Sequence, residues 1–442
     1  MSLGKRISRR SQKKPLFYGW IMVAVMTAVG SLSMALGTLN FGLFIRPMGD
    51  ELGIGRGVFG LAQTARMTAA AVTSPIVGRL IDQIGSRLLV PLAAFITGAA
   101  LMAVANISQG WQLVMLFALM GIIGIGGPSN LTTTVPIAKW FVRQRGRAMA
   151  IVTAGPFVGG ILFVPLTQLL IDALGWRSAW VALAIIGAGL ILPLGLIFIR
   201  HEPTDMGLQP DGDGPDPPPN PHNAVAKHLS NSYLEKNQEV SWTLREALHS
   251  STFWRLAAVF SLVMLSISTV GLHRIPNFVD QGLDPGLVAI ATAMDAAAGG
   301  VSTVAMGLLT ERVPSRYMGS IAFTLLAVAI YFTIIGDTVL LMFVSFTLFG
   351  AGIGGLMLLN SFLWADYFGR LHLGSIRGIV MPITMFFSAL GAPLAGFIRD
   401  TTGTYDNIWW LSVVIMLIAT ALLASTGRPI KTHGFVQPSK SL

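Results

Sequence analysis

The sequence Gly78-Arg79-Leu80-Ile81-Asp82-Gln83-Ile84-Gly85-Ser86-Arg87 recurs as a related pattern at Gly307–Arg316. In both copies an acidic residue stands four positions after the first glycine and an arginine stands nine positions after it. Each copy lies between two long apolar runs. A loop motif repeated between apolar runs indicates two related halves, an arrangement typical of membrane carriers.

The composition excludes an ordinary soluble protein. Of 442 residues, 53% are hydrophobic and only 11% are charged, and the mean hydropathy is +0.67. Soluble domains carry about 25% charged residues. The apolar runs reach the ~20 residues that a helix needs to cross a bilayer, and the alternating strands of a membrane barrel are absent from the sequence. We therefore expect transmembrane helices.

Charge and cysteine content narrow the function further. The formal net charge is +10, but the basic residues lie in short loops beside apolar runs, where they set orientation. We therefore expect a lipid bilayer as partner and no nucleic acid. The absence of cysteine excludes disulfides, thiol catalysis and cysteine-ligated metals.

The pattern predicts an all-α membrane protein with twelve transmembrane helices in two pseudo-symmetric six-helix bundles. The predicted spans lie near 17–45, 54–77, 88–106, 112–137, 148–171, 178–199, 253–278, 286–309, 317–336, 338–363, 378–398 and 408–427. The predicted organisation is a basic N-terminus (1–16), an N-terminal bundle (17–200), a linker (201–250), a C-terminal bundle (251–428) and a tail (429–442).

The loops predict the orientation. Starting with the basic N-terminus inside, the loops on the cytoplasmic side hold most of the arginines and lysines, which places both termini in the cytoplasm. The outer loops hold only Arg46, Arg56, Arg177 and Arg399. The first apolar run is too long for the core of a signal peptide and is interpreted as an uncleaved span. We expect a multi-pass protein of the inner (plasma) membrane that functions as a monomer.

The segment from Arg200 to about Ser250 differs from the rest. Its run Pro210–Pro219 is rich in proline, glycine and aspartate and cannot bury enough apolar surface to order itself. It is interpreted as a flexible cytoplasmic linker. Residues Trp242 to Trp254 form either a short interfacial helix or a plain connector.

The loop residues Gly78, Asp82, Gly85 and Arg87 resemble the signature of the major facilitator superfamily, and the copy at 307–316 fits the same family. Within it, the chain looks most like bacterial relatives of monocarboxylate porters and oxalate/formate antiporters. That resemblance rests on Tyr18-Gly19-Trp20, Lys139–Ala148, Arg200–Pro203, Gly207–Pro210 and Phe253-Trp254. It implies a two-bundle transporter for a small organic anion.

One departure from the monocarboxylate porters concerns span eight. The family pattern has an aspartate there, followed four positions later by a substrate-binding arginine. Asp295 matches the aspartate, but Gly299 stands where the arginine is expected. A different residue must then supply the positive charge for an anion.

The repeated motif is interpreted as a gate. Asp82 and Arg87 in the first half, with Glu311 and Arg316 in the second, form either a latch that breaks between conformations or static loop caps. The glycines Gly78, Gly85 and Gly307 permit close helix packing or tight turns.

Charged residues inside spans are costly and are functional candidates by default. Arg274 lies near the outer end of span seven. We expect its side chain either to bind a carboxylate or to extend to the outer membrane surface. Asp295 is the candidate for proton coupling and a plausible partner of Arg274, the alternative being a fixed structural ion pair. Arg66 in span two is the second candidate anion ligand, or pairs with a neighbouring helix.

Four polar residues complete the candidate substrate site. His273 either titrates at the site or is a hydrogen-bonded interface residue. Asn40, Asn130 and Asn360 lie in spans one, four and ten, which line the cavity in the family that the chain resembles. We expect these asparagines either to form hydrogen bonds with the substrate or to hold helices together.

The sequence carries no catalytic or nucleotide-binding pattern. It has no Gly-rich loop ending in Lys-Ser/Thr and no metal-spaced cluster, so we expect no enzyme activity, no cofactor and no metal. The leading hypothesis is a secondary carrier of a small organic anion, driven by a proton or an exchanged anion. One alternative is an exporter of amphipathic or toxic compounds, and another is a carrier-fold sensor or scaffold that no longer transports.

Overall fold

The architecture comes from a computed structural model, which describes residues 17–35, 38–123, 136–137, 140–141, 145–200, 203–209, 242–309, 312–369 and 373–429. Every regular element within these ranges is a helix. Asn130 and Glu311, two of the predicted site residues, lie outside them.

The first half contains α1 (Tyr18–Ala35), α2 (Thr38–Leu52), α3 (Arg56–Ile84), α4 (Ser86–Val104), α5 (Gly110–Ile123) and α7 (Arg145–Phe198). Span one, predicted as one helix, is divided into α1 and α2. Spans five and six are joined in α7, which bends at Gly175 with φ +77°. That backbone conformation is readily adopted only by glycine, so Gly175 makes the turn without a loop.

The second half contains α9 (Leu244–His249), α10 (Ser251–Gly271), α11 (Arg274–Asp280), α12 (Pro285–Leu309), α13 (Ser315–Ile335), α14 (Val339–Phe368), α15 (Leu373–Thr402) and α16 (Asp406–Ser425). Span seven is divided into α10 and α11. A short 3-10 helix, Pro203–Met206, follows the first half. Each of the twelve predicted spans thus has a helix, and the all-α membrane fold is confirmed.

The apolar side chains lie in two large interiors, in a smaller cluster that contains residues of both halves such as Leu43 and Ile275, or against the lipid. One large buried cluster is built almost entirely from the first half, and a second is built from the second half. Large apolar side chains such as Val72, Leu308 and Leu340 are at least 70% exposed. Among the described residues, eight helices are long and apolar enough to cross a membrane by themselves. The exposed apolar surface is the one expected against acyl chains.

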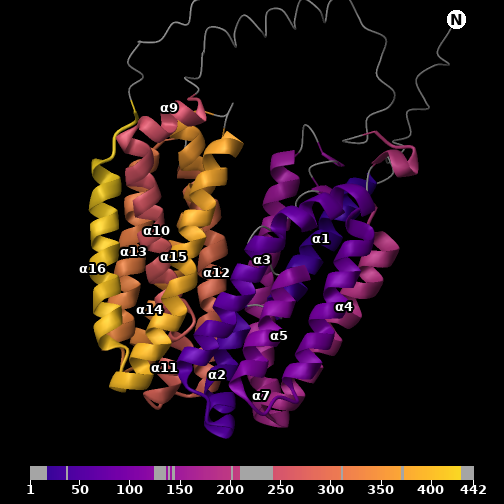
Figure 1. Cartoon of the computed structure of the whole chain (residues 1–442), viewed down its shortest axis with the longest axis vertical. Helices are drawn as coiled ribbons and strands as arrows, with labels where there is room; N and C mark the ends of the chain where they lie inside the picture. The colour runs from indigo at the N-terminus through magenta and orange to yellow at the C-terminus, as the bar shows by residue number, and fades with distance from the viewer. Residues whose placement is uncertain are drawn as a thin grey trace, which may run out of the picture.

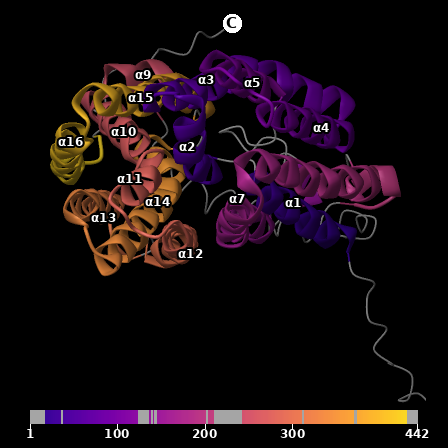
Figure 2. The same cartoon turned by 90° about the horizontal axis from the view of Figure 1, so that it is seen from below.

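The two bundles stand side by side and approach each other most closely at one end (Figure 1). That end carries α2, α11 and the bend of α7, and is called the α11 end; the opposite end carries α9 and is called the α9 end. Figure 2, seen from below, shows α2 of the first half beside α11 of the second. Toward the α9 end the bundles diverge (Figure 1).

Small residues allow the closest approach between the halves, where α3 packs on α15. A Cβ on Gly60 would lie 2.7 Å from the Ala392 backbone, and one on Gly396 would lie 2.6 Å from Gly57 Cα. Thr64 Oγ1 also donates a hydrogen bond of 2.5 Å to the Ala389 carbonyl across this contact. A larger side chain at these glycines would force the halves apart.

The segment before the second half contains a helix, as one of the two sequence interpretations expected. Thr243 and Glu246 form a capping box at the start of α9. The Trp242 backbone N–H donates to the Phe368 carbonyl at 2.9 Å, and the two rings meet edge to face. This end of the predicted linker is therefore attached to α14.

Candidate functional site

The charged side chains of Arg274 and Asp295 meet inside the second half. Arg274 begins α11, directly after the break in span seven, and its Nη2 forms an ion pair with Asp295 Oδ2 of α12. The two side chains are only 1% and 8% exposed. The pairing predicted from the sequence is present, and Arg274 does not reach the surface.

Two aromatic rings hold the guanidinium of Arg274. Its Cζ lies 4.1 Å from the ring centre of Phe346 and 4.0 Å from that of Phe349, both on α14. Cation–π contacts at desolvated sites contribute about 2 kcal/mol. Arg274 Nε and Nη1 are buried and have no hydrogen-bond partner among the described residues. The ion pair thus leaves three of the five N–H donors of the guanidinium unused, one on Nε and two on Nη1.

Glycine on α14 makes room for Asp295. A Cβ on Gly350 would overlap the Asp295 backbone oxygen and would lie 2.5 Å from its Oδ1. One turn further along α14, the Gly354 carbonyl accepts a hydrogen bond of 3.1 Å from Thr303 Oγ1 of α12. The close packing of α12 on α14 therefore fixes the depth and direction of the carboxylate.

The other candidate ligands lie on separate helices. Arg66 is 7% exposed on α3, and its backbone packs against Gly121 of α5. Asn40 is fully buried in α2, and Asn360 is half-buried in α14. The structure brings Arg274 and Asp295 together, while the roles of Arg66, Asn40 and Asn360 as substrate ligands stay predictions.

His273 is fully buried and bonded on both sides of its ring. Nε2 lies 2.8 Å from the Ala392 carbonyl of α15, and Nδ1 lies 3.3 Å from the Tyr405 hydroxyl. The geometry is that of the hydrogen-bonded residue, one of the two sequence interpretations. In this conformation both ring nitrogens are engaged, so a substrate contact through them stays a prediction.

The repeated motif falls at the α9 end. Gly78 and Asp82 lie in the last turns of α3, and the position of the Asp82 side chain is outside what the structure describes. Gly85 has φ +79° between α3 and α4, which explains the glycine there. Arg87 is exposed and its Nε donates to the Leu196 carbonyl at 3.3 Å, within the same half.

The second copy of the motif shows a different local network. Gly307 lies in α12, and Arg316 Nη2 donates to the Tyr317 hydroxyl at 3.0 Å. Beside it, Asp366 of α14 accepts from Ser315 at 2.7 Å and from Arg428 at 2.5 Å. A gating role for either copy stays a prediction.

An ion cluster at the α11 end joins the halves. Asp280, the last residue of α11, lies 3.1 Å from Arg56 Nη2 and 3.7 Å from both Arg46 Nε and Arg399 Nη2. Asp400 of α15 accepts hydrogen bonds of 2.8 Å from the backbone N–H groups of Arg56 and Gly57. The Asp280 cluster is defined as Arg46, Arg56, Asp280, Arg399 and Asp400.

The Asp280 cluster was missed by sequence reasoning. In the sequence its arginines stand out only as charges of the outer loops. Arg46 and Arg56 belong to the first half, whereas the other three residues belong to the second. The Asp400 carboxylate also meets the positive end of the α3 dipole. No spacing along the chain relates residues 46, 280 and 400, so only the fold could reveal the cluster.

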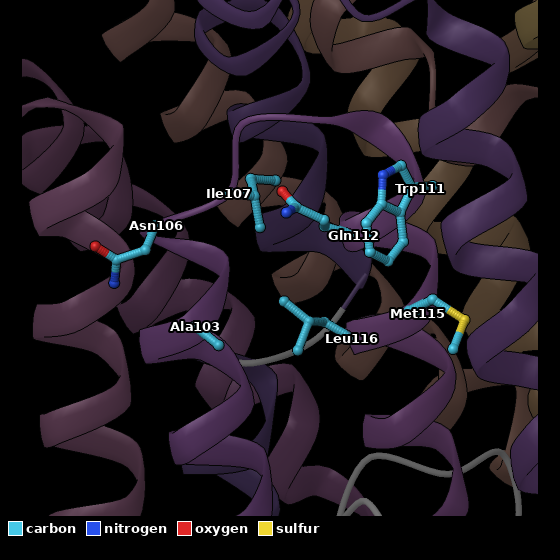
Figure 3. Close-up of a pocket in the computed structure, with 7 residues that line it drawn as sticks. All are labelled: Ala103, Asn106, Ile107, Trp111, Gln112, Met115 and Leu116. Atoms are coloured by element: carbon cyan, nitrogen blue, oxygen red, sulfur yellow. The ribbon is translucent and has the colours of Figure 1, made fainter.

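A shallow pocket between α4 and α5 lies apart from this site (Figure 3). Trp111, Met115 and Asn106 are among its lining residues, and none of the seven carries a charge. Trp111 and Met115 are more than 60% exposed on the outer surface of the first half. The pocket therefore does not contribute to the buried ion pair.

Two helical bundles, a lipid-facing apolar surface and a buried ion pair define a multi-pass membrane transporter. The sequence profile of the Major Facilitator Superfamily matches residues 21–284 and 275–440. The chain therefore belongs to this superfamily, whose members are transporters and not enzymes.

Three proteins illustrate the similarity. Human monocarboxylate transporter 11 is 22% identical over 94% of this chain and 84% of its own length. The probable sulfoacetate transporter SauU of Cupriavidus necator is 24% identical over 83% of this chain and 84% of its own length. A bacterial homologue of the human lysosomal transporter Spinster, solved inward-facing and unoccupied, has TM-score 0.67 at 14% identity, with 93% and 97% of the two chains covered. This last likeness concerns the fold alone.

Neutralising one member of the ion pair is expected to destabilise the fold more than neutralising both. Arg274→Gln leaves Asp295 buried and unpaired, which costs about 3–5 kcal/mol. Arg274→Gln with Asp295→Asn removes both charges and recovers most of that loss. Thermal unfolding of the purified proteins measures the difference. A double variant as unstable as the single one would contradict a coupled pair.

Proposed function

We propose that this transporter is a secondary carrier of a small organic anion and that Arg274 binds the anionic group. The observation that supports the proposal is the buried guanidinium, held by Asp295 and two phenyl rings, with Nε and Nη1 unused. Arginine donors match a carboxylate or sulfonate in geometry as well as charge. The relatives described as monocarboxylate and sulfoacetate transporters carry ligands of this chemistry.

In this proposal Arg274 on α11 replaces the arginine that monocarboxylate porters have on span eight. Gly299 occupies that position in α12, while Asp295 one turn away still provides a carboxylate partner. The guanidinium thus reaches the same aspartate from a neighbouring helix. A substrate anion competes with Asp295 for Arg274, and a proton on Asp295 favours the exchange. Asp295 is the proposed coupling residue.

Transport follows from alternating access. The positive-inside pattern suggests that the α9 end faces the cytoplasm. The bundles diverge toward that end (Figure 1), and the Asp280 cluster joins them at the other. The conformation is then inward-facing, and the Asp280 cluster must break for the outward-facing state to form.

Uptake by reconstituted protein tests the anion site. Arg274→Ala is expected to reduce uptake of radiolabelled acetate, lactate or sulfoacetate into proteoliposomes by about 100-fold, as losing a buried charged hydrogen-bonding partner costs several kcal/mol. Arg274→Lys keeps the charge but loses the planar fork, so it recovers only part of the uptake.

The matched control is Arg255→Ala, which removes an exposed arginine from α10 and leaves uptake unchanged. Full uptake by Arg274→Ala would refute the proposed ligand. Efflux of amphipathic dyes without uptake of any of the three anions would favour the exporter hypothesis instead.

Asp295→Asn tests coupling. An amide holds no exchangeable carboxyl proton, so the variant is expected to lose accumulation driven by an imposed pH gradient. Counterflow exchange of labelled for unlabelled anion at equal pH persists because it needs no net proton movement. The measurement compares the two modes in the same proteoliposomes. Unchanged gradient-driven accumulation would refute the coupling role.

Asp280→Asn tests the gate. The substitution leaves Arg46, Arg56 and Arg399 without their common anion, so their repulsion is expected to open the α11 end. Because the chain has no cysteine, a single Thr64→Cys reporter between α3 and α15 measures opening by its reaction with an impermeant maleimide added outside intact cells. Labelling is expected to rise several-fold.

The matched control is Asp337→Asn, which neutralises an exposed aspartate in the loop between α13 and α14. This loop lies at the same end of the second half, so general loss of acidic charge there is also tested. Equal labelling in Asp280→Asn and the control would contradict a gating role for the cluster.

A further inference from the structure

Phe157 of the first half covers two consecutive glycines of the second half. A Cβ on Gly299 would lie 2.8 Å from Phe157 Cε1, and one on Gly300 would lie 3.6 Å from Phe157 Cβ. Phe157 itself is half-buried on α7. Because they have no side chains, the two glycines of α12 leave space for the Phe157 ring, which belongs to the opposite bundle.

The packing of α7 on α1 directs this ring. A Cβ on Gly155 would lie 2.6 Å from the Thr27 carbonyl oxygen, and Gly159 packs equally closely on Ser31. Ser31 Oγ also donates to the Gly155 carbonyl at 2.8 Å. Phe157 lies two residues from each glycine and is thus turned about 200° around the helix. Its ring points away from α1 and toward α12.

The glycines that the ring covers begin one helical turn from Asp295 on α12. Gly299 follows Asp295 by four residues, which places it about 6 Å further along the same helix face, toward the α9 end. On its other side, a Cβ at Gly299 would lie 3.2 Å from the Gly350 carbonyl oxygen. Phe157 and α14 together fill the place that a side chain at position 299 would take.

We propose that Phe157 is a specificity-determining residue that contacts the apolar part of the transported anion while Arg274 holds its charged group. This inference rests on the proposed function. The spacing of one helical turn between Asp295 and Gly299 suits an anion with a tail of a few carbon atoms. The Phe157 ring limits the length of the carbon tail that fits. Because the ring lies between the two bundles, this maximum length changes when the bundles open or close.

A chain-length series tests the proposal in proteoliposomes. Wild type, Phe157→Ala and Phe157→Trp are compared for uptake of acetate, butyrate and hexanoate. The uptake ratio of hexanoate to acetate is expected to rise about tenfold in Phe157→Ala, because a pocket distinguishes added methylenes by roughly this factor. The ratio falls in Phe157→Trp. Phe95→Ala, which removes an exposed ring of α4, leaves it unchanged.

A second measurement tests the contact without transport. Gly299→Ala forces a methyl group against the Phe157 ring, so it is expected to lower the melting temperature by several degrees. In the Phe157→Ala background the same substitution lowers it by less than half as much. Equal losses in the two backgrounds would overturn the contact on which the proposal depends.

The outcomes separate this inference from the proposed function. Arg274-dependent uptake with the same chain-length ratio in wild type and Phe157→Ala would overturn the role of Phe157 alone. Absence of uptake of every carboxylate and of sulfoacetate by the wild type would overturn both proposals.

Discussion

Burial of Arg274 with Asp295 is the constraint to which much of the second half is fitted. Neither charge is stable alone in an apolar interior, because only a well-placed partner of opposite charge compensates for the free energy of hydration that it loses. The break between α10 and α11 brings the guanidinium to α12, and Gly350 lets α14 approach close enough to fix the carboxylate. Phe346 and Phe349 then cover the guanidinium. The three N–H donors on Arg274 Nε and Nη1 that have no partner among the described residues give the site its capacity for an anion.

The contacts between the halves differ in kind along the molecule. At the α11 end an ionic cluster centres on Asp280, which lies within 4 Å of three arginines. Beside it, Leu43 and Val164 of the first half belong to one buried apolar cluster with Ile275 of the second. Small residues of α3 and α15 pack together from the Arg56 end of α3 onward, and Phe157 packs on the α12 glycines. Ionic contacts at a wet surface are individually weak and easily exchanged, whereas close apolar packing resists change. Of these contacts, the ionic ones are therefore the easiest to exchange when the bundles rock.

Much of the fold could be predicted from the sequence, but only part of the candidate site. Hydropathy placed all twelve spans, because an apolar helix of sufficient length has few alternatives in a bilayer. Arg274 and Asp295 were found because charges inside spans are rare, and their pairing followed from the short loop between their helices. The Asp280 cluster was missed since its members are distant in sequence and resemble ordinary loop charges. Nothing in the sequence distinguished Phe157 from the other phenylalanines, of which the chain has 24 in all.

The sequence by itself determined the class of protein. The features that determined it are apolar runs of bilayer length, a repeated loop motif and two charges inside spans that are neighbours along the chain. These depend on hydrophobicity and local spacing, which are properties of the linear chain. Only the tertiary structure decided that His273 bonds to Ala392 and Tyr405 and that Phe157 lies one turn from Asp295. Those relations cross from one helix or bundle to another, and they depend on how glycine-lined faces pack, which no single segment specifies.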